Sequence, residues 1–529
     1  MDYHKGKTAL LALLSILMIS CGGSSGSSSV TNSQVHPDGV NLGGAYVLED
    51  WFFSSSQVDH YVATPCTYKD TGIANSQTFA QSTSVPAFTW TSETQMIQQF
   101  AAQGYTDSQI EALFDSHRAN YLLDPANHIA NLNSVFARIA GLGIKEVRLP
   151  ITWAITYPNQ SYTINPGNGG TPIVVPATTQ VTLIQDPFYP GLKWATIPIG
   201  DVMQVLKAAS KHGIKVLLDI HAYPGGSSDG TYNGIWPLQP EFWNTGLDTD
   251  NTPIYQENFQ TIFQNLITWA ESLYSLSDKS YAAGLGGLTP MNEPAHLMGI
   301  PPARCSSGSW GIAGYQQVLD TLALAVADFG QSSLPKHHVK LYMNIIETMF
   351  STSLPVTGLY RTGQQPDALS GGQVYGIIGT WWKSVTTVND RQTWAVLDLH
   401  HYFAWDGNCN TCLQNFVTNG VIQQAGFDQM KQCSDDWYLN IRGMLDLAST
   451  DLLATTEFSA SANSDTYQSC ASGNAQPSTP DNYADYRNAV LKYQIDDAKQ
   501  ADIDLYFWTW TIPYNTNFQN EWSLTNILK

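Results

Sequence analysis

Short apolar runs alternate along the chain with longer segments in which apolar residues recur every three to four positions. Short runs bounded by turn residues are typical of buried strands, whereas the longer period is typical of amphipathic helices. Eight runs are predicted to be strands: Val40–Leu42, Glu146–Leu149, Val216–Ile220, Leu288–Met291, Lys340–Ile345, Ala395–Leu399, Leu452–Thr455 and Leu505–Trp508. Helices are predicted between them, among them Ser108–Tyr121, Ile199–His212, Asn258–Leu273, Tyr315–Phe329, Asp428–Leu447 and Tyr483–Gln500.

These alternations predict an α/β fold, a (β/α)₈ TIM barrel whose functional face lies at the C-terminal ends of the strands. Length alone would suggest about three domains. Because the eight strands need nearly the whole chain, we expect one domain over residues 36–529. Four long segments follow predicted strands and are predicted to be insertions on that face: Ser54–Glu93, Thr156–Trp194 with a hairpin from Ile173 to Ile184, Phe403–Cys433 and Ser459–Asp481. They either shape a cleft or have a structural role.

The N-terminus has the pattern of an export signal. Two lysines precede the apolar run Ala9–Ile19, so residues 1–20 are predicted to be a signal peptide that is too short to span a membrane. Met18–Cys21 is similar to a bacterial lipobox, with Met18 in place of the usual leucine, and predicts lipidation of Cys21. Residues 21–35, rich in Gly and Ser, are predicted to be a flexible tether. We expect an exported protein, lipid-anchored at the cell surface or in the periplasm; secretion is the alternative.

Charge and aromatic content limit the classes of molecule that the protein is expected to bind. The chain has 44 acidic and 24 basic residues, a formal net charge of −20. Nucleic acid and anionic lipid are therefore poor partners, and membrane contact is expected only through the N-terminal anchor. The 16 Trp and 26 Tyr suit a protein that presents rings to sugars as well as burying them. A neutral substrate and a monomer are expected.

The cysteine count agrees with export. Apart from Cys21, six cysteines remain, which allow up to three disulfides in 15 connectivities. The pair Cys409 and Cys412 has the spacing of half a zinc site, but no second pair of matching spacing follows it. Disulfides are therefore favoured over zinc, and their pairing stays open among Cys66, Cys305, Cys409, Cys412, Cys433 and Cys470.

Two glutamates end apolar runs that are far apart in the chain. Glu293 follows Leu288–Met291 and precedes Pro294, while Glu457 follows Leu452–Thr455. Either glutamate alone is adequately explained as part of a polar turn after a strand. Two carboxyl groups at the C-terminal ends of barrel strands are what a glycoside hydrolase needs, because one protonates the leaving oxygen and the other attacks or activates water.

Other strand ends carry polar or aromatic residues. Arg148 lies within an apolar strand, where a guanidinium requires a carboxylate partner. His221 and His400 end the third and sixth predicted strands, and Trp508 ends the eighth. A lone histidine is more often structural than catalytic, and a lone tryptophan more often packs in a core. The end of a barrel strand favours a sugar-stacking role for Trp508.

Taken together, these segments resemble the retaining (β/α)₈ glycosidases, specifically glycoside hydrolase family 5 in the branch that contains exo-β-1,3-glucanases. The matching segments occur in family order, and they are Gly39–Gly44, Val47–Trp51, Val147–Ile151, Asp219–Gly226, Asn292–Pro294, His400–Tyr402, Glu457–Ser459 and Trp508–Trp510. The resemblance implies that residues 36–529 are a glycosidase catalytic domain acting on a β-glucan polysaccharide or oligosaccharide.

The resemblance also implies roles for single residues. Glu457 is expected to be the nucleophile of a double displacement and Glu293 the general acid and base. Asn292 is expected to bind the sugar 2-hydroxyl, and Arg148 and Tyr402 to orient Glu457.

Four further residues are expected to bind substrate. His221 and His400 line the subsite around the scissile bond, Trp508 stacks beneath the sugar, and Glu49 bonds hydroxyls at the closed end of the pocket. This chemistry requires no metal and no organic cofactor.

Three departures from the family pattern leave the substrate open. Ala45 replaces a usual tryptophan, the loop Ala222–Ser228 differs from the usual sequence, and Thr511 replaces a usual lysine. An exo-β-1,3-glucanase that releases glucose is the favoured function. Endo action, β-1,6 or β-1,4 linkage and mannose specificity are alternatives. A protein of another class, a surface glycan-binding lipoprotein without turnover, is disfavoured because both glutamates are present.

Overall fold

The computed structural model describes most of the chain after residue 35. The described residues are 36–54, 63–64, 67–68, 74–124, 128–228, 231–235, 241–243, 245–294, 315–345, 371–404, 409, 413–462, 480–514 and 519–528. They belong to one compact unit, Val35–Lys529. The predicted signal peptide, the tether and Cys21 lie outside the described residues. None of the described helices combines the length and apolar character needed to cross a membrane.

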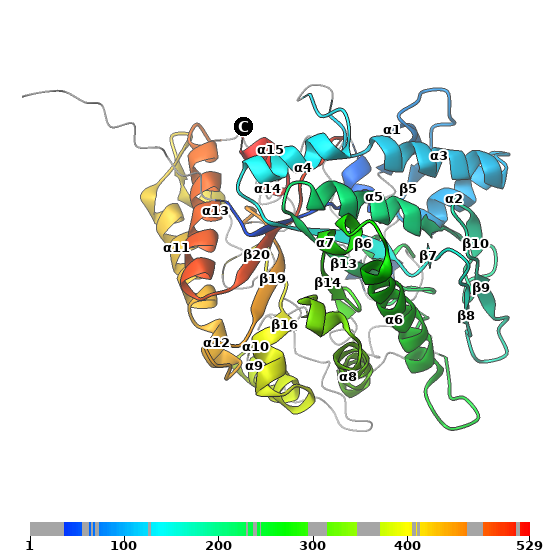
Figure 1. Cartoon of the computed structure of the whole chain (residues 1–529). Helices are drawn as coiled ribbons and strands as arrows, with labels where there is room; N and C mark the ends of the chain where they lie inside the picture. Colours follow the sequence, from blue (N-terminus) through cyan, green and yellow to red (C-terminus); the bar gives the residue numbers. More distant parts are fainter. Residues whose placement is uncertain are drawn as a thin grey trace, which may run out of the picture. The chain divides into compact units, whose positions relative to one another are not determined.

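Eight parallel strands close into a barrel, which confirms the predicted (β/α)₈ fold (Figure 1). Each predicted strand is present, with ends that differ by a few residues. Val40 pairs with Val147 on one side and with Phe507 on the other, which closes the sheet. In chain order the barrel strands are β1 (Gly39–Asn41), β6 (Glu146–Thr152), β13 (Lys215–Ala222), β14 (Leu285–Thr289), β15 (Lys340–Asn344), β16 (Ala395–Asp398), β19 (Leu453–Phe458) and β20 (Asp504–Phe507).

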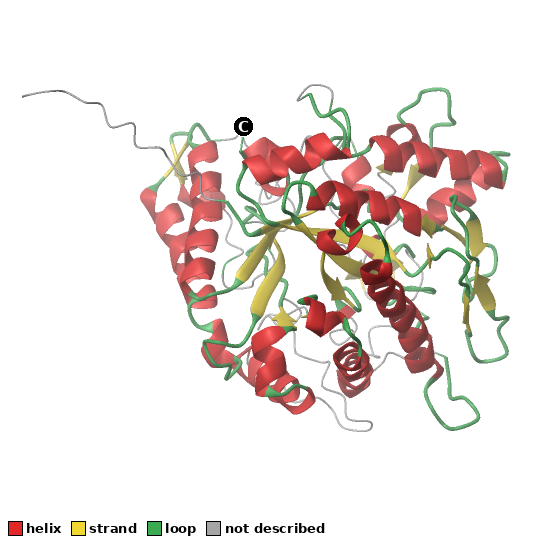
Figure 2. Ribbon diagram, viewed as in Figure 1, coloured by secondary structure: helices red, strands yellow, loops and turns green. Residues whose placement is uncertain are grey.

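Helices surround these strands, as Figure 2 shows in red around yellow. The longer ones are α2 (Glu93–Ala102), α3 (Asp107–Asn120), α4 (Leu132–Gly141), α5 (Ile199–Ser210), α6 (Ile254–Ser272), α8 (Tyr315–Gln331), α9 (Gly371–Val385), α11 (Gln424–Tyr438) and α13 (Tyr483–Gln500). The short ones are α1 (Ser76–Ala80), α7 (Ser280–Gly284), α10 (Val388–Thr393), α12 (Ile441–Met444), α14 (Gln519–Trp522) and α15 (Leu524–Ile527).

The single helix predicted over Asp428–Leu447 is wrong, and the other five predicted helices are confirmed. The segment forms α11 and α12, separated after Tyr438. At the break the Nδ2 group of Asn440 donates to the carbonyl oxygen of Asp436 (3.1 Å). An asparagine side chain that bonds nearby carbonyls in this way competes with the helical backbone pattern.

The barrel interior is apolar toward the N-terminal ends of the strands, a region called the lower half of the barrel from here on. Leu217, Tyr342, Val396, Ala454 and Tyr506 form a separate buried cluster there. Two glycines leave room for the rings: a Cβ at Gly39 would lie 2.2 Å from Tyr506 Cδ1, and one at Gly287 would lie 2.7 Å from Tyr342 Cε2. Side chains therefore fill the space below the functional face, as in other barrels of this size.

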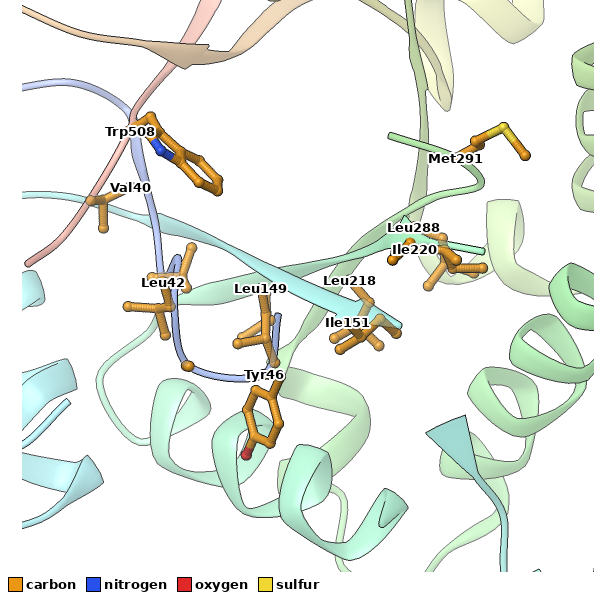
Figure 3. Packing of buried hydrophobic residues seen from close by; sticks show 14 of the residues in the cluster. Val40, Leu42, Tyr46, Leu149, Ile151, Leu218, Ile220, Leu288, Met291 and Trp508 are labelled. Carbon is orange, nitrogen blue, oxygen red and sulfur yellow. The ribbon is translucent and has the colours of Figure 1, made fainter. Parts of the chain in front are cut away.

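Alternation along the strands separates this interior from the outer core. Leu218 and Ile220 belong to the large core between strands and helices, where they lie near Leu149 and Ile151 (Figure 3). Successive side chains of a strand point to opposite faces. On β13, the odd-numbered residues Leu217 and Asp219 therefore face the barrel axis.

The insertion after β6 contains two hairpins, so the predicted single hairpin from Ile173 to Ile184 is wrong. Strand β9 (Ile173–Val175) forms a hairpin with the preceding strand β8 (Tyr162–Ile164). Strand β10 (Leu183–Gln185) forms a second hairpin with the following strand β11 (Lys193–Ala195). The turn of the first hairpin contains three consecutive residues with positive φ, from Gly167 to Gly169. Glycine and asparagine adopt this conformation readily. A hairpin that turns at these residues is therefore favoured over the predicted hairpin from Ile173 to Ile184.

The remaining short strands form small sheets outside the barrel. Ile197 pairs with Ile155, so the end of the insertion returns to its start. These strands are β2 (Ala63–Thr64), β3 (Thr67–Tyr68), β4 (Ala74–Asn75), β5 (Thr89–Trp90), β7 (Ile155–Thr156), β12 (Ile197–Pro198), β17 (Val417–Thr418) and β18 (Val421–Ile422).

One disulfide joins Cys409 to Cys433 of α11, with their Cα atoms 5.8 Å apart. It fixes the segment after β16 to a helix on the outside of the barrel. A zinc site that uses the sulfur of Cys409 is therefore ruled out. Of the disulfides left open by the sequence, this one joins Cys409 to Cys433. Four of the cysteines considered above lie outside the described residues: Cys66, Cys305, Cys412 and Cys470.

Glu146 lies at the start of β6, beside the lower layer of the barrel. Its Oε2 atom accepts hydrogen bonds from the hydroxyl groups of Tyr342 (3.3 Å) and Tyr506. Burial raises the pKa of Glu146 to about 7; the charge of Asp504 adds to this shift and that of Lys340 opposes it. A carboxyl whose pKa is higher in the folded chain stabilises the fold only while it is protonated.

We therefore expect thermal stability to fall as pH rises from the unfolded-state pKa of 4.5 through 7. Glu146→Gln mimics the protonated carboxyl. Its melting temperature should equal that of the wild type at pH 5 and lie about 1–3 °C above it at pH 8. Calorimetry across this range measures the difference. The exposed Asp436→Asn is the control, and an equal shift in both variants would contradict the role of Glu146.

Candidate active site

The backbone on either side of Asn292 is held by the neighbouring strands. The N–H of Asn292 donates to the carbonyl oxygen of Ile220 at the end of β13 (3.0 Å). The N–H of Glu293 donates to Oδ1 of Asn344 in β15 (2.7 Å). Glu293 has a φ of 43°, in the left-handed region that a non-glycine residue enters at a cost. These two bonds fix the position of the backbone at Glu293, which follows β14.

Glu457 lies on β19 and is bound through both of its carboxyl oxygens. Arg148 Nη1 donates to Oε1, and the hydroxyl group of Tyr402 donates to Oε2 (2.7 Å). Glu457 is 5% exposed and Glu293 is 6% exposed. The two donors therefore fix the orientation of the Glu457 carboxyl group.

Arg148 is fully buried and joins four strands of the barrel. Besides Glu457, it donates to Oδ1 of Asn41 (3.0 Å) and Oδ1 of Asn292 (2.6 Å), and it pairs with Oδ2 of Asp219 (2.9 Å). Burial lowers the pKa of Arg148, but the charges of Asp219 and Glu457 raise it by more. The expectation that this buried guanidinium has carboxylate partners is confirmed.

His400 lies between the two glutamates. Its Nδ1 atom is 2.7 Å from Oε1 of Glu293 and 3.5 Å from Oε2 of Glu457. On the other side of the ring, Nε2 is 3.1 Å from Oγ1 of Thr456 and 3.6 Å from Oδ2 of Asp398. Burial lowers the pKa of His400, but the charge of Glu457 and the hydrogen bonds with Asp398 and Glu293 together raise it to about 10.

The two carboxyl groups are close together. One oxygen of Glu293, one oxygen of Glu457 and a ring nitrogen of His400 all lie within 4.8 Å of one another. Inverting glycosidases hold their carboxyl groups about 6.5–9.5 Å apart to admit a water molecule, whereas retaining enzymes hold them about 5–5.5 Å apart. The carboxyl oxygens here lie closer together than the inverting range and nearer to the retaining one.

The same three side chains are the donors that a metal ion would find in this part of the structure. With a pKa of about 10, however, His400 is an imidazolium at neutral pH and has no free lone pair for a metal. Arg148 adds a second positive charge beside Glu457. The site therefore favours protons over metal cations, and the absence of a required metal stays a prediction.

His221 and Trp508 form one wall of the site. Their rings are stacked, with centroids 5.7 Å apart and an interplanar angle of 9°. Nδ1 of His221 bonds Oδ2 of Asp219 (2.6 Å), and its Nε2 accepts from Nδ2 of Asn292 (3.3 Å). His221 is thus fixed by Asp219, and Asn292 is held at both ends of its amide. Trp508 is joined to Thr509 by a cis peptide bond.

Glu49 lies near both glutamates in a buried setting. Its Oε2 atom accepts from Nε1 of Trp51 (2.7 Å), and its Oε1 atom has no hydrogen-bond partner among the described residues. Burial raises the pKa of Glu49 well above its ordinary value, and the charges of Glu457 and Glu293 act in the same direction. Burial therefore favours the protonated form of Glu49, and one of its oxygens is available to a ligand.

The structure brings together all nine residues that the sequence proposed for catalysis or substrate binding, with Cys21 outside the described part. It adds buried polar residues that were not proposed: Asn41, Asp219, Asn344, Asp398 and Thr456. Each lies within an apolar strand, the same signal that singled out Arg148, and could have been found in that way. Trp522, whose ring is 5.3 Å from Tyr402 and 6.0 Å from Trp51, comes from the C-terminal segment and had no such signal.

No protein-family model and no curated protein matches the chain. Several solved structures are similar to the chain at low identity. One is described as a GH5-4 broad specificity endoglucanase from an uncultured bacterium (11% identity, TM-score 0.39, 90% of this chain and 87% of that one). Another is a hyperthermophilic endocellulase from Pyrococcus horikoshii (15%, 0.36, 75% and 84%). A third is the catalytic domain of the major endoglucanase from Xanthomonas campestris (15%, 0.34, 73% and 81%). These values are too low to assign the chain to a family.

Arg148 allows a direct test of the network. Arg148→Met keeps the length of the side chain but leaves Asp219 and Glu457 buried without their cation. Removing one partner of a buried ionic network costs about 3–5 kcal/mol. We expect a loss of this size in the free energy of unfolding, measured by urea denaturation. Lys492→Met removes an exposed pair with Asp496 and should cost less than about 1 kcal/mol; equal losses would contradict the importance of the network.

Proposed function

We propose that this protein is a retaining glycoside hydrolase that cleaves β-glucan. The observation that carries the proposal is the pair of buried carboxyl groups, Glu293 and Glu457, with oxygens within 4.8 Å at the C-terminal ends of two barrel strands. Around the pair, Arg148 and Tyr402 hold Glu457, and His400 contacts both glutamates.

In the first step, Glu457 attacks the anomeric carbon while Glu293 gives its proton to the departing glycosidic oxygen. The bond between this carbon and the leaving oxygen breaks, and a glycosyl ester forms on Glu457. In the second step, Glu293 takes a proton from water, and the resulting hydroxide displaces Glu457 from the sugar. The two inversions retain the β configuration.

The supporting residues act on charge and position. Arg148 and Tyr402 keep Glu457 ionised and aimed, and both bonds weaken as its charge is lost in the ester. Asn292, fixed between Arg148 and His221, is placed to bind the sugar 2-hydroxyl, a bond that strengthens in the oxocarbenium-like transition state. Trp508 offers a ring face to the sugar.

The specific activity that we propose is that of an exo-β-1,3-glucanase releasing glucose. Glu49 and Trp522, which are buried, and Trp51, which is half-buried, form a group beside the glutamates, and we propose that this group closes one end of a substrate pocket. Glu49 has one unbonded oxygen and suits a terminal sugar, because a carboxyl group can bond the hydroxyl groups of a sugar. An open cleft for endo action is the alternative within the same chemistry.

The place of action is part of the proposal. Export through the signal peptide, with lipidation of Cys21 or secretion, would bring the barrel to glucan outside the cytoplasm. A binding protein without turnover is disfavoured, because a degenerate site has no need to keep Arg148, Tyr402 and Asn292 bonded around two intact carboxyl groups.

Product analysis tests the substrate. The mature chain is incubated with laminarin, a β-1,6-glucan, a mixed-linkage glucan, carboxymethylcellulose and mannan, and products are followed from the earliest times. We expect glucose alone from laminarin, released first as the β anomer in NMR spectra. Early oligosaccharides from another polymer would reassign the protein as an endo-acting enzyme, and release of the α anomer would contradict retention.

Substitution of the nucleophile tests the mechanism. Glu457→Gln should fold and bind glucan but lose turnover by about 10⁴-fold or more, because an amide cannot form the glycosyl ester. Glu93→Gln changes another buried glutamate, on α2, and should keep near-normal turnover. Hydrolysis is measured on the polymer identified above, and binding by calorimetry. Near-normal turnover by Glu457→Gln would disprove the assignment.

A further inference from the structure

The two proposed catalytic residues lie on strands that are not neighbours. Glu293 follows β14 and Glu457 lies on β19, and in the barrel β15 and β16 lie between them. The last residue of each intervening strand is polar and fully buried: Asn344 ends β15 and Asp398 ends β16. In the register of the sheet these two residues are directly opposite each other.

An unbroken row of hydrogen bonds crosses these strands. The N–H of Glu293 donates to Oδ1 of Asn344 (2.7 Å), and Nδ2 of Asn344 donates to Oδ2 of Asp398 (3.0 Å). Asp398 then accepts from Thr456 twice: the backbone N–H donates to Oδ1 (2.8 Å) and the hydroxyl group to Oδ2 (2.5 Å). Thr456 directly precedes Glu457. The row therefore links the main chain at one glutamate to the main chain beside the other.

We propose that this Asn344–Asp398–Thr456 bridge sets the separation of the two carboxyl groups and that its members are positioning residues for the reaction. The inference rests on the proposed glycosidase function. The required distance spans three strand intervals, and backbone pairing alone does not specify it to a fraction of an ångström. Side-chain bonds between interior residues of adjacent strands supply the missing constraint.

The conformation of Glu293 requires such a constraint. A non-glycine residue at a φ of 43° relaxes unless its surroundings hold it, and the Asn344 oxygen accepts the N–H that this conformation exposes. The amide of Asn344 matches the two sites, because it offers an acceptor to Glu293 and a donor to Asp398. An aspartate at this position could not donate to Asp398 when ionised.

Asp398 has a second role through His400. Burial raises the pKa of Asp398, but the hydrogen bond with His400 and the charges of His400 and Arg148 lower it by more. The ring of His400 is thus held between Asp398 and Glu293, with Thr456 Oγ1 3.1 Å from its Nε2. The bridge therefore reaches Glu293 twice, through its backbone N–H and through its carboxyl oxygen.

Adjacent threonines on β19 provide a matched pair for the test. Thr455 and Thr456 are both fully buried. The hydroxyl group of Thr455 has no hydrogen-bond partner among the described residues, whereas that of Thr456 bonds Asp398. Replacing either residue by valine removes one hydroxyl group and keeps the shape. A difference in turnover between the variants then reports the bridge, not burial in the barrel.

The experiment compares Thr456→Val, Thr455→Val and Thr456→Ser on the polymer that the wild type hydrolyses. We expect kcat to fall by about tenfold to a hundredfold in Thr456→Val, with KM changed less than about twofold, because misplacement of the reacting groups by up to about 1 Å can cost a hundredfold. Thr455→Val should match the wild type, and Thr456→Ser should recover most of the lost activity. Equal kcat in the two valine variants would overturn the inference.

Asn344→Ala tests the other end of the bridge with two aryl β-glycosides of the sugar that the enzyme accepts. A phenyl leaving group needs the proton of Glu293, whereas a 2,4-dinitrophenyl group does not. We expect a loss of about a hundredfold in kcat/KM for the phenyl glycoside and less than about fivefold for the dinitrophenyl glycoside, because kcat/KM reports the first step and is not affected by the later role of Glu293 as base. Equal losses on both would overturn the bridge, and inactivity of the wild type on every substrate would overturn the proposed function with it.

Discussion

The burial of one guanidinium group constrains the upper half of the barrel. Arg148 has no access to water, so every carboxylate and amide oxygen to which it donates must also be buried. Asn41, Asp219, Asn292 and Glu457 meet this requirement from four other places in the chain. The orientation of Glu457 is thus a consequence of accommodating Arg148, and the polar upper layer follows from the same requirement.

The balance of charge in this layer favours a proton bound among its carboxyl groups. Two cations, Arg148 and His400, share the layer with the carboxyl groups of Asp219, Asp398, Glu457 and Glu293. Four ionised carboxylates around two cations would leave an excess of negative charge in a buried site, which is unfavourable. A proton held among these groups removes part of the excess. The proposed mechanism needs that proton on Glu293, which is bonded to His400.

Sequence reasoning succeeded where a single strand carries the information. The eight barrel strands are visible as apolar runs, and Glu293, Glu457 and Arg148 stand out because they interrupt or end such runs. Asn41 and Asp398 carry the same signal and were overlooked only because their partners were not considered. The hairpins around Ile173 and the position of Trp522 depend on pairing between distant or competing segments. No local pattern specifies such pairing, so these features required the structure.

The layers of the barrel divide the requirements of the protein among different residues. The lower layer around Tyr342 and Tyr506 fills space, and the upper layer around Arg148 and Asp398 holds charges and distances. Departures from the resembled family fall elsewhere, at Ala45, at Thr511 and in the loop Ala222–Ser228, of which only Ala222 belongs to a barrel strand. These positions can change without altering a bond of the Arg148 network or the Asn344–Asp398–Thr456 bridge. Under the proposed function, substrate choice can therefore diverge while the chemistry of the two glutamates is kept.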